Sequence, residues 1–558
     1  MKVYEAIAQG IVAEGCDKMF GLMGDGNMWL WAALSRNRDV RFYSARHEAV
    51  AVSMADGYAR VTGRVGVATI TCGPGLTHAA TPIVAAARHR SPVVILTGEV
   101  SANDRHNPQI FDHRGFAEAC EARFVRLTSG EFAAQELREA FYMAQQHRCP
   151  VVFSMPVNVQ GEELKKPWAY QPSRDFLSAQ PRDPAADALE PIMQALMQAE
   201  RPVIVAGRGA MDAKDEIIAL ADRIGALLAT SMMAKDLFLD HPFDVGVSGG
   251  FASAPTEQLL RQADLVLAIG ASLNFYTAGE SDFLFSGATI ARIDIAPAPD
   301  ELGWLPGLYL QADARAAAVA LAEALEKRQV SKTGFRTPAT QAALRAELPL
   351  PEKSTDGLDP CRLMRALSQA MPRDAMVTCG SAQFWGFPIM HFALPENGRI
   401  EFTGDFGAIG AGIPIGIGVA AGTPERPQVV IEGDGSLMQH LQELETVVRY
   451  GLQLVLIVMN DAGYGAEVYK LGAKGLDPTL AQWESPDFVA VSRALGGDGV
   501  CLQSETEIGD ALRTGLKHGG LYLIDARISP TSPTDRYMKH IFGKQNQAPL
   551  LRRGQSVD

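Results

Sequence analysis

Short apolar runs, each followed by a glycine-containing turn and a helical pattern, recur along the whole chain. Clear examples are GVATIT (66–71), RPVIVAGRG (201–209), PQVVIEGDG (427–435) and LVLIVMNDAGYG (454–465). Strands that alternate with helices are typical of parallel sheets covered by helices on both faces. The sequence therefore predicts an α/β fold.

Two polar stretches divide this pattern into three segments. The chain has 558 residues, which is too long for a single hydrophobic core. The stretches 165–187 and 325–340 are polar and have no clear hydrophobic period, as is typical of linkers. We expect three doubly wound parallel-sheet domains, at residues 1–165, 188–328 and 355–545.

Composition excludes several classes of protein. The formal net charge of −13 argues against nucleic acid as a partner, because phosphate backbones need basic surfaces. The seven cysteines form no CxxC pair, so neither a zinc cluster nor a disulfide framework is indicated. The first 15 residues predict an amphipathic helix rather than a signal peptide, and no apolar run is long enough to span a membrane. We expect a cytoplasmic protein with no membrane partner.

Acidic residues follow two neighbouring strands of the last segment. A strand at 429–432 runs into Gly-Asp-Gly-Ser, and a later strand at 454–459 runs into Asn-Asp. Parallel strands end at the same edge of a sheet, so Asp434 and Asp461 are expected to meet where open α/β sheets bind ligands. Two carboxylates there suit a hard divalent cation, and the glycine-rich turn suits phosphate oxygens. The alternative is that both are ordinary turns that end strands. The apolar residues after the turn are spaced for one helix: Leu437, Leu441, Leu444, Val447 and Val448.

A second pattern lies near the N-terminus, where RHEAVAVSMADGYAR (46–60) is followed by TITCGPGLTHA (69–79). Together with GDG…ND, it resembles the thiamine diphosphate (ThDP)-dependent decarboxylase and acetolactate synthase family. The resemblance spans almost the whole chain in the order pyrimidine-binding domain, middle domain and diphosphate-binding domain. It implies an enzyme that uses ThDP and Mg²⁺.

The resemblance assigns the diphosphate end of the cofactor to the last domain. The implied Mg²⁺ ligands are Asp434, Asp461 and the main-chain carbonyl of Gly463, although the family more often has Asn-Asn than Asn-Asp. Tyr464 matches the Gly-Tyr that follows the metal loop. The residues implied to contact the diphosphate come from GDGS and from CGSAQFW (379–385): Gly380, Ser381, Gly435 and Ser436.

The resemblance assigns the pyrimidine end to Glu48, which would hydrogen-bond N1′ and share a proton with it. A carboxyl group is needed because the cofactor loses its C2 proton to its own 4′-imino group, giving first a C2 ylid and later an enamine. Read alone, Glu48 is an ordinary glutamate in the first turn of a helix. In the segment TGDFGAIG (403–410), Gly407 and Ile409 match the family's glycine carbonyl and bulky apolar residue that hold the cofactor bent. His78 replaces the family's asparagine, and its role is left open.

Four residues match substrate positions of different family members. Asp25 and Glu467 fall where pyruvate-type decarboxylases carry active-site carboxylates, but the His-His pair of those enzymes is missing. Gln109 resembles the glutamine of acetolactate synthases and aldehyde lyases, with His113 nearby. Each of the four is equally consistent with an ordinary surface-polar residue.

The leading hypothesis is a 2-oxo acid decarboxylase/carboligase, similar to acetolactate synthase, with a small 2-oxo acid or aldehyde as substrate. Alternatives are a ThDP-dependent lyase of a 2-hydroxy ketone or acyl-CoA, an NAD-dependent dehydrogenase, and a non-catalytic regulatory homologue. The resemblance implies a homodimer or homotetramer with active sites between subunits. GRGAMD (207–212) begins like a dinucleotide fingerprint but lacks the third glycine, so bound FAD in the middle domain is not favoured.

Overall fold

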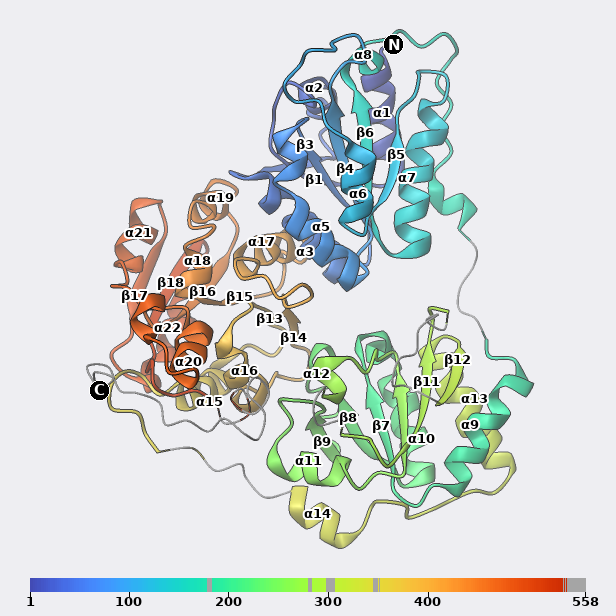
Figure 1. Cartoon of the computed structure of the whole chain (residues 1–558), viewed down its shortest axis with the longest axis vertical. Helices are drawn as coiled ribbons and strands as arrows, with labels where there is room; N and C mark the ends of the chain where they lie inside the picture. The colour runs from blue at the N-terminus through green and yellow to red at the C-terminus, as the bar shows by residue number, and fades with distance from the viewer. Residues whose placement is uncertain are drawn as a thin grey trace.

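The computed structural model describes residues 1–177, 183–279, 284–297, 307–344, 350, 352–534, 536 and 538. It contains three six-stranded sheets, and every strand pair in them is parallel. Helices cover both faces of each sheet, as Figure 1 shows. The predicted fold class, three α/β domains, is confirmed, whereas the predicted boundaries remain predictions, and the last of them, residue 545, lies outside the described residues.

The first sheet has the order β2-β1-β3-β4-β6-β5. Its strands are β1 (Lys18–Gly21), β2 (Arg41–Ser44), β3 (Gly66–Ile70), β4 (Val93–Glu99), β5 (Arg123–Arg126) and β6 (Pro150–Pro156). Its helices are α1 (Val3–Ala13), α2 (Met28–Leu34), α3 (Glu48–Thr62), α4 (Pro74–Thr77), α5 (Ala80–His89), α6 (His113–Ala119), α7 (Ala133–His147) and α8 (Val157–Gln160). The amphipathic helix expected at the N-terminus is α1.

The middle sheet has the order β12-β11-β10-β7-β8-β9. Its strands are β7 (Pro202–Ala206), β8 (Leu227–Thr230), β9 (Asp244–Val247), β10 (Leu265–Ile269), β11 (Thr289–Asp294) and β12 (Gly307–Gln311). Its helices are α9 (Ala186–Gln198), α10 (Lys214–Ile224), α11 (Ala254–Leu260), α12 (Phe275–Ala278), α13 (Ala314–Lys327) and α14 (Pro338–Leu344).

The third sheet has the order β14-β13-β15-β16-β18-β17. Its strands are β13 (Met376–Cys379), β14 (Arg399–Phe402), β15 (Gln428–Gly433), β16 (Leu454–Asn460), β17 (Asp498–Cys501) and β18 (Leu521–Arg527). Its helices are α15 (Pro360–Ala370), α16 (Gly386–His391), α17 (Gly412–Gly422), α18 (Asp434–Leu437), α19 (Glu443–Arg449), α20 (Gly465–Ala473), α21 (Phe488–Ala494) and α22 (Ile508–His518). Every residue of β15 and β16 is buried, as expected for central strands of a covered parallel sheet.

The single helix expected after GDGS is wrong in one respect, because it is interrupted between α18 and α19. The intervening residues 438–442 continue in tighter i→i+3 turns, such as His440 N–H to the Leu437 carbonyl at 3.1 Å. The core-facing residues Leu437, Leu444 and Val447 are still buried. The apolar spacing thus predicted the buried face but not the local hydrogen bonding.

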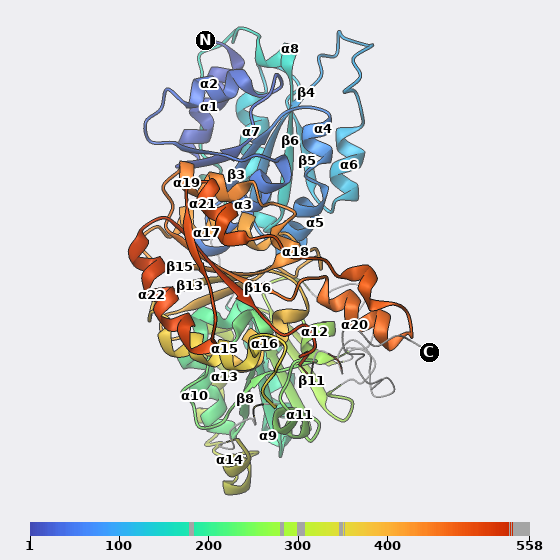
Figure 2. The same cartoon turned by 90° about the vertical axis from the view of Figure 1, so that its left-hand side faces the viewer.

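The first and third units pack through α3 and α17, and the third unit lies between the other two along the long axis of the molecule (Figure 2). The backbones approach closely here. A Cβ on Gly57 would lie 2.3 Å from the carbonyl oxygen of Ile415, and one on Gly418 would lie 2.0 Å from that of Met54. Side chains from both units form one continuous hydrophobic cluster around this contact. In the described part of the chain, no helix is long and apolar enough to cross a membrane.

Candidate active site

Two carboxylates meet where β15 and β16 end. The strands are paired in parallel, so Asp434 and Asp461 leave the sheet at the same edge, where the charge of one carboxylate acts on the other. Gln383 Nε2 donates to Asp461 Oδ2 at 3.2 Å, and the Ser485 hydroxyl lies 3.4 Å from Asp434 Oδ2. Among the described residues, no cationic side chain forms an ion pair with either carboxylate. The sequence-based expectation that these two residues lie together agrees with this geometry.

The electrostatics of this carboxylate pair favour a divalent cation. Burial raises the pKa of both aspartates above their ordinary range, and the charge of Asp434 raises the pKa of Asp461 further. A bound metal ion offsets the repulsion between two neighbouring carboxylates, so both can be ionised when the metal is present. Oxygen-only ligands of this kind fit Mg²⁺.

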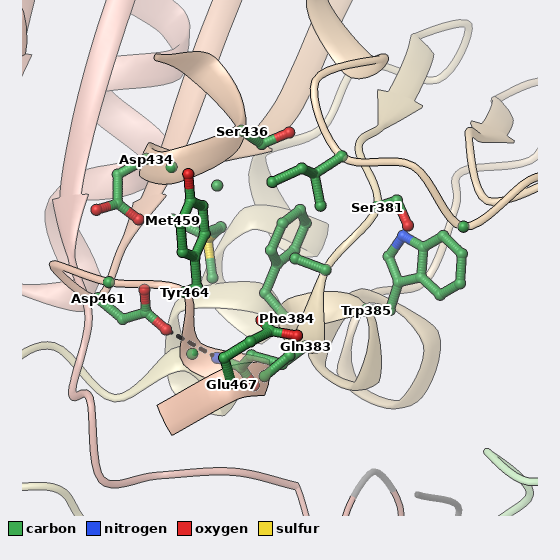
Figure 3. Close-up of a pocket in the computed structure, with 18 of the residues that line it drawn as sticks. Ser381, Gln383, Phe384, Trp385, Asp434, Ser436, Met459, Asp461, Tyr464 and Glu467 are labelled. Carbon is green, nitrogen blue, oxygen red and sulfur yellow. Dashed lines mark hydrogen bonds between the residues drawn. The ribbon is translucent and has the colours of Figure 1, made fainter. Parts of the chain in front are cut away.

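A cavity of about 250 Å³ opens beside the pair (Figure 3). Its polar wall is contributed by the third unit: Ser381, Gln383, Asp434, Gly435, Ser436, Asp461, Gly463, Glu467 and Lys470. Its aromatic wall includes residues of the middle unit as well: Phe251, Phe275, Tyr276, Phe384, Trp385 and Tyr464. A polar end beside the acidic pair and an aromatic remainder suit a ligand with a charged end and a flat or apolar body.

The loop 403–411 borders the cavity through Gly407 and Ile409. Gly407 has φ +72°, a left-handed conformation that favours glycine. The N–H of Gly410 donates to the hydroxyl of Ser436 at 2.6 Å, which ties the loop to the GDGS turn. Sequence-predicted residues of two separate motifs are therefore held together.

Gly380 lies beside Glu432 and does not line the cavity, whereas its neighbour Ser381 does. A Cβ on Gly380 would lie 1.9 Å from Glu432 Oε1, so this position has no space for a side chain. Glu432 is fully buried, and burial raises its pKa to about 7. The glycine is explained by this contact, and a role of Gly380 in diphosphate binding stays a prediction.

A buried group of charges joins all three units next to the loop 403–411. Arg60 on α3 forms ion pairs with Asp56 at 2.7 Å and with Asp405 at 2.9 Å. His89 Nδ1 lies 3.0 Å from the other oxygen of Asp405. Arg208 of the middle unit donates to the main-chain carbonyl of His89. Burial alone would raise the pKa of Asp405, but Arg60 and His89 overcome it and hold that pKa well below its ordinary value.

The glycines of GRGAMD are explained by packing between loops. A Cβ on Gly207 would lie 2.1 Å from the carbonyl oxygen of Gly270, and the N–H of Gly209 donates to that same oxygen at 3.2 Å. The motif that begins like a dinucleotide fingerprint therefore joins the turn after β7 to the turn after β10.

Glu48 is the first residue of α3, and its side chain is 12% exposed. His47 is the N-cap and accepts the Ala49 N–H through Nδ1 at 3.1 Å. His78 Nδ1 lies 3.0 Å from Glu48 Oε2. The residue that the sequence left without a role is thus in direct contact with the proposed activator.

Asp25 and Gln109 gather at the same edge of the first sheet. A Cβ on Gly73, in the GPG turn, would lie 2.7 Å from the side chain of Gln109, whose Oε1 accepts from Cys72 at 3.1 Å. Asp25 is exposed, and the glycines on either side of it pack against Thr71 and Cys72. These residues surround the turn next to Glu48, as expected for one site.

His113 and Glu467 have different surroundings. His113 is buried, and its Nδ1 lies 3.0 Å from the Ser154 hydroxyl, which in turn donates to Glu99. Burial lowers the pKa of His113. Glu467 on α20 lines the cavity and pairs with Lys470 at 3.1 Å. The prediction for His113 stays open, with this nitrogen already engaged inside the first unit.

Several residues of the site were not predicted from the sequence. Gln383 belongs to the stretch CGSAQFW (379–385), which also contains Gly380 and Ser381, so its place in the sequence could have indicated it. Ser485 hydrogen-bonds Asn460 at 2.7 Å from a loop with no recognisable motif. The aromatic residues of the middle unit come from a domain to which the sequence assigned no site.

The two predicted halves of the site do not share this cavity. None of the residues that line it belongs to the described residues 1–177. Within one chain, Glu48 therefore does not line the cavity that holds Asp434 and Asp461.

Models of known protein families match all three units of the chain. The family model for the thiamine pyrophosphate enzyme N-terminal TPP binding domain matches residues 1–121, that for the central domain matches 189–325, and that for the C-terminal TPP binding domain matches 378–526. The chain belongs to the thiamine pyrophosphate enzyme family. Thiamine pyrophosphate is another name for ThDP, so the cofactor expected from the sequence is confirmed.

Relatives of known name cover nearly the full chain. A probable 2-ketoarginine decarboxylase of Pseudomonas aeruginosa is 29% identical over 537 residues, which are 94% of this chain and 93% of that protein. The acetolactate synthase large subunit of Corynebacterium glutamicum is 29% identical over 530 residues, 91% of this chain and 84% of that protein. The isozyme 3 large subunit of Escherichia coli acetolactate synthase is 24% identical over 572 residues, 99% and 97% of the two chains. This family member is a ThDP-dependent enzyme of the carbon–carbon lyase and transferase class.

Proposed function

We propose that this chain is a Mg²⁺- and ThDP-dependent 2-oxo acid decarboxylase and carboligase. The observation that carries the proposal is the pair of buried carboxylates Asp434 and Asp461, which interact electrostatically and line one cavity with an aromatic wall. No cationic side chain among the described residues forms an ion pair with either of them. A Mg²⁺ ion held by the two carboxylates would supply the missing positive charge for them and for the diphosphate, and the aromatic wall suits the rest of the cofactor.

The diphosphate end would be held by the third unit. Asp434, Asp461 and the carbonyl of Gly463 would ligate Mg²⁺ through oxygen. The Ser436 and Ser381 hydroxyls and the Gly435 N–H would contact phosphate oxygens, with Gly380 shaping the turn behind them. The ring of Tyr464, which is T-shaped against Trp483 at 4.7 Å, would close this end of the cavity.

The activator end would be held by Glu48. When bound, ThDP supplies a carbon nucleophile at thiazolium C2 and an acceptor for the electron pair released with CO₂. Glu48, whose side chain is 12% exposed, would hydrogen-bond N1′ and exchange a proton with it. The carbonyl of Gly407 would accept from the 4′-amino group, and Ile409 would support the bent conformation of the cofactor.

The substrate would be a small 2-oxo acid, with an aldehyde or second oxo acid as acceptor. The names 2-ketoarginine decarboxylase and acetolactate synthase of two relatives support this class. Asp25 and Glu467 would move the proton taken up after CO₂ leaves, and Gln109 would contact the substrate through its amide. His113, whose Nδ1 lies 3.0 Å from the Ser154 hydroxyl, would act from within the first unit.

We further propose that each active site forms between two chains, so that the smallest active unit is a homodimer and the enzyme a dimer or tetramer. The support is that the cavity with Asp434 contains no residue of the unit that carries Glu48. A partner chain would bring its own Glu48 to the open side of this cavity.

The test is a titration of the apoenzyme with ThDP in excess Mg²⁺ and in EDTA. We expect tight binding only with Mg²⁺, and its loss in Asp434→Asn. The matched control is Asp487→Asn, an aspartate at the N-terminus of α21 outside the cavity. Release of CO₂ from a panel of 2-oxo acids, with and without an aldehyde, then tests the reaction. Equal ThDP affinity in Mg²⁺ and EDTA would contradict the metal site, and no CO₂ from any 2-oxo acid would contradict the reaction.

A further inference from the structure

Three potential metal ligands cluster at the start of α3, away from the oxygen-rich metal site proposed above. Ligand atoms of His47, Glu48 and His78 all lie within 4.8 Å of one another. The two imidazole rings are stacked, with centroids 4.8 Å apart. The carboxylate oxygen of Glu48 lies 3.0 Å from His78 Nδ1. Two imidazoles and one carboxylate form a ligand set that zinc enzymes use with an open fourth position.

The ring nitrogens needed for a metal are available. His47 uses Nδ1 as the helix N-cap acceptor, which leaves Nε2 for an outside ligand. The side chain of His78 is 51% exposed, so its ring is accessible from solvent. Arg46, the adjacent cation in the sequence, is paired with Glu445 at 2.9 Å, so its charge is neutralised locally.

The geometry needs only a small adjustment. Tetrahedral zinc with ligands at about 2.0–2.1 Å places its ligand atoms roughly 3.3 Å apart. The cluster closes to that spacing if the ring of His78 and the carboxylate of Glu48 shift by about 1–1.5 Å. Both are terminal side-chain groups, so the backbone of α3 and of the GPG turn need not move.

We propose that His47, Glu48 and His78 form a binding site for a transition-metal ion of the Zn²⁺ class, and that a metal bound there excludes ThDP. Imidazole ligands favour zinc, copper, nickel or cobalt, whereas oxygen-only sites favour Mg²⁺. The site thus differs in ligand chemistry from Asp434 and Asp461. Glu48 cannot ligate zinc and share a proton with N1′ at once.

The exclusion of ThDP rests on the proposed function of Glu48, whereas the metal site does not. The enzyme would consequently be inhibited by zinc in competition with its cofactor. The inhibition would be strongest before ThDP binds, because bound cofactor covers Glu48. Zinc at ten times its dissociation constant would raise the apparent ThDP dissociation constant about 11-fold, by simple mass action.

The first experiment measures metal binding to the full-length apoenzyme in excess Mg²⁺. Zn²⁺ is titrated against a chromophoric chelator, and Co²⁺ is used as a spectroscopic probe of imidazole ligation. We expect one site per chain, weakened at least tenfold in His78→Asn and in Glu48→Gln. The control His518→Asn removes an exposed histidine at the end of α22 and should bind as the wild type does. Equal zinc affinity in the wild type, His78→Asn and Glu48→Gln would overturn the site.

The second experiment repeats the ThDP titration with and without Zn²⁺. For each variant, the apparent ThDP dissociation constant with Zn²⁺ is compared with that of the same variant without Zn²⁺. We expect the 11-fold weakening in the wild type and its loss in His78→Asn. Zinc that binds to the cluster without weakening ThDP binding would overturn the competition and would also count against Glu48 as a cofactor contact. If no zinc binds while Glu48→Gln still slows exchange of the cofactor C2 proton, the metal site is wrong and the proposed function stands.

Discussion

Replacing Asp405 with asparagine should destabilise the protein strongly, because the substitution removes one charge from the buried group that joins the three units. Asparagine keeps the shape of the side chain and one oxygen to accept from His89 Nδ1. It leaves Arg60, whose side chain is fully buried, with Asp56 as its remaining ion-pair partner at 2.7 Å. The change therefore isolates the charge of Asp405.

The expected magnitude follows from the geometry. A unit-charge pair at 2.9 Å attracts by about 6 kcal/mol at an effective dielectric constant of about 20. Desolvation offsets part of this, and removal of one partner of a buried pair costs about 3–5 kcal/mol overall. Because Asp56 still neutralises Arg60, we expect the lower end, about 3 kcal/mol. The control Glu396→Gln breaks an exposed pair with Arg373, with side chains 63% and 78% exposed, and should change stability by less than about 1 kcal/mol.

The assay is urea unfolding of both variants with the same protein concentration and without cofactor. The pKa of Asp405 is lowered, so its contribution is fully present above the ordinary aspartate pKa of about 3.9 and is lost as pH falls through the lowered value. The difference in the free energy of unfolding between Asp405→Asn and the wild type should thus stay constant from about pH 6 to about pH 8. If Asp405→Asn unfolds at the same urea concentration as Glu396→Gln, the buried group of charges does not stabilise the contact between the three units, and the reasoning fails.

Four further outcomes follow from the site and the packing. Glu48→Gln should still bind ThDP but slow exchange of its C2 proton into D₂O by about 10²–10⁴-fold, and unchanged exchange would remove Glu48 as the activator. Mixed dimers of Glu48→Gln and Asp434→Ala should recover activity, whereas inactive verified heterodimers would indicate sites within one chain. Gly57→Ala should cost about 1–3 kcal/mol because its Cβ meets the Ile415 carbonyl, and Gly287→Ala, which meets nothing within 4 Å, is the control. The pKa values of Asp434 and Asp461 are raised, so the metal-free protein loses stability as pH rises above the ordinary aspartate range. The increase in melting temperature caused by Mg²⁺ with ThDP should therefore grow from about pH 6 to about pH 8. An increase that is the same at both pH values would contradict this expectation.

The sequence predicted those features that depend on neighbouring residues along the chain. Apolar runs and the turns after them predicted three parallel sheets, because strand burial leaves a local pattern. The meeting of Asp434 and Asp461 was predictable because parallel strands must end at one edge. By contrast, the break between α18 and α19 was not predictable, since the apolar spacing is the same for α-helical turns and for a short stretch of tighter turns.

The contacts between units have no corresponding pattern in the sequence. These contacts determine where the residues of the site lie. Arg60, His89, Arg208 and Asp405 come from four separate segments, and nothing in the sequence relates one to another. Yet Asp405 stands two residues before Gly407. The position of the loop 403–411 therefore depends on the positive charges that the other two units place around Asp405. The same holds for His78, which takes the place of the family's asparagine and lies against Glu48. A motif therefore identifies the residues that meet the cofactor, whereas the groups that set their position and charge are found only when the chain is folded.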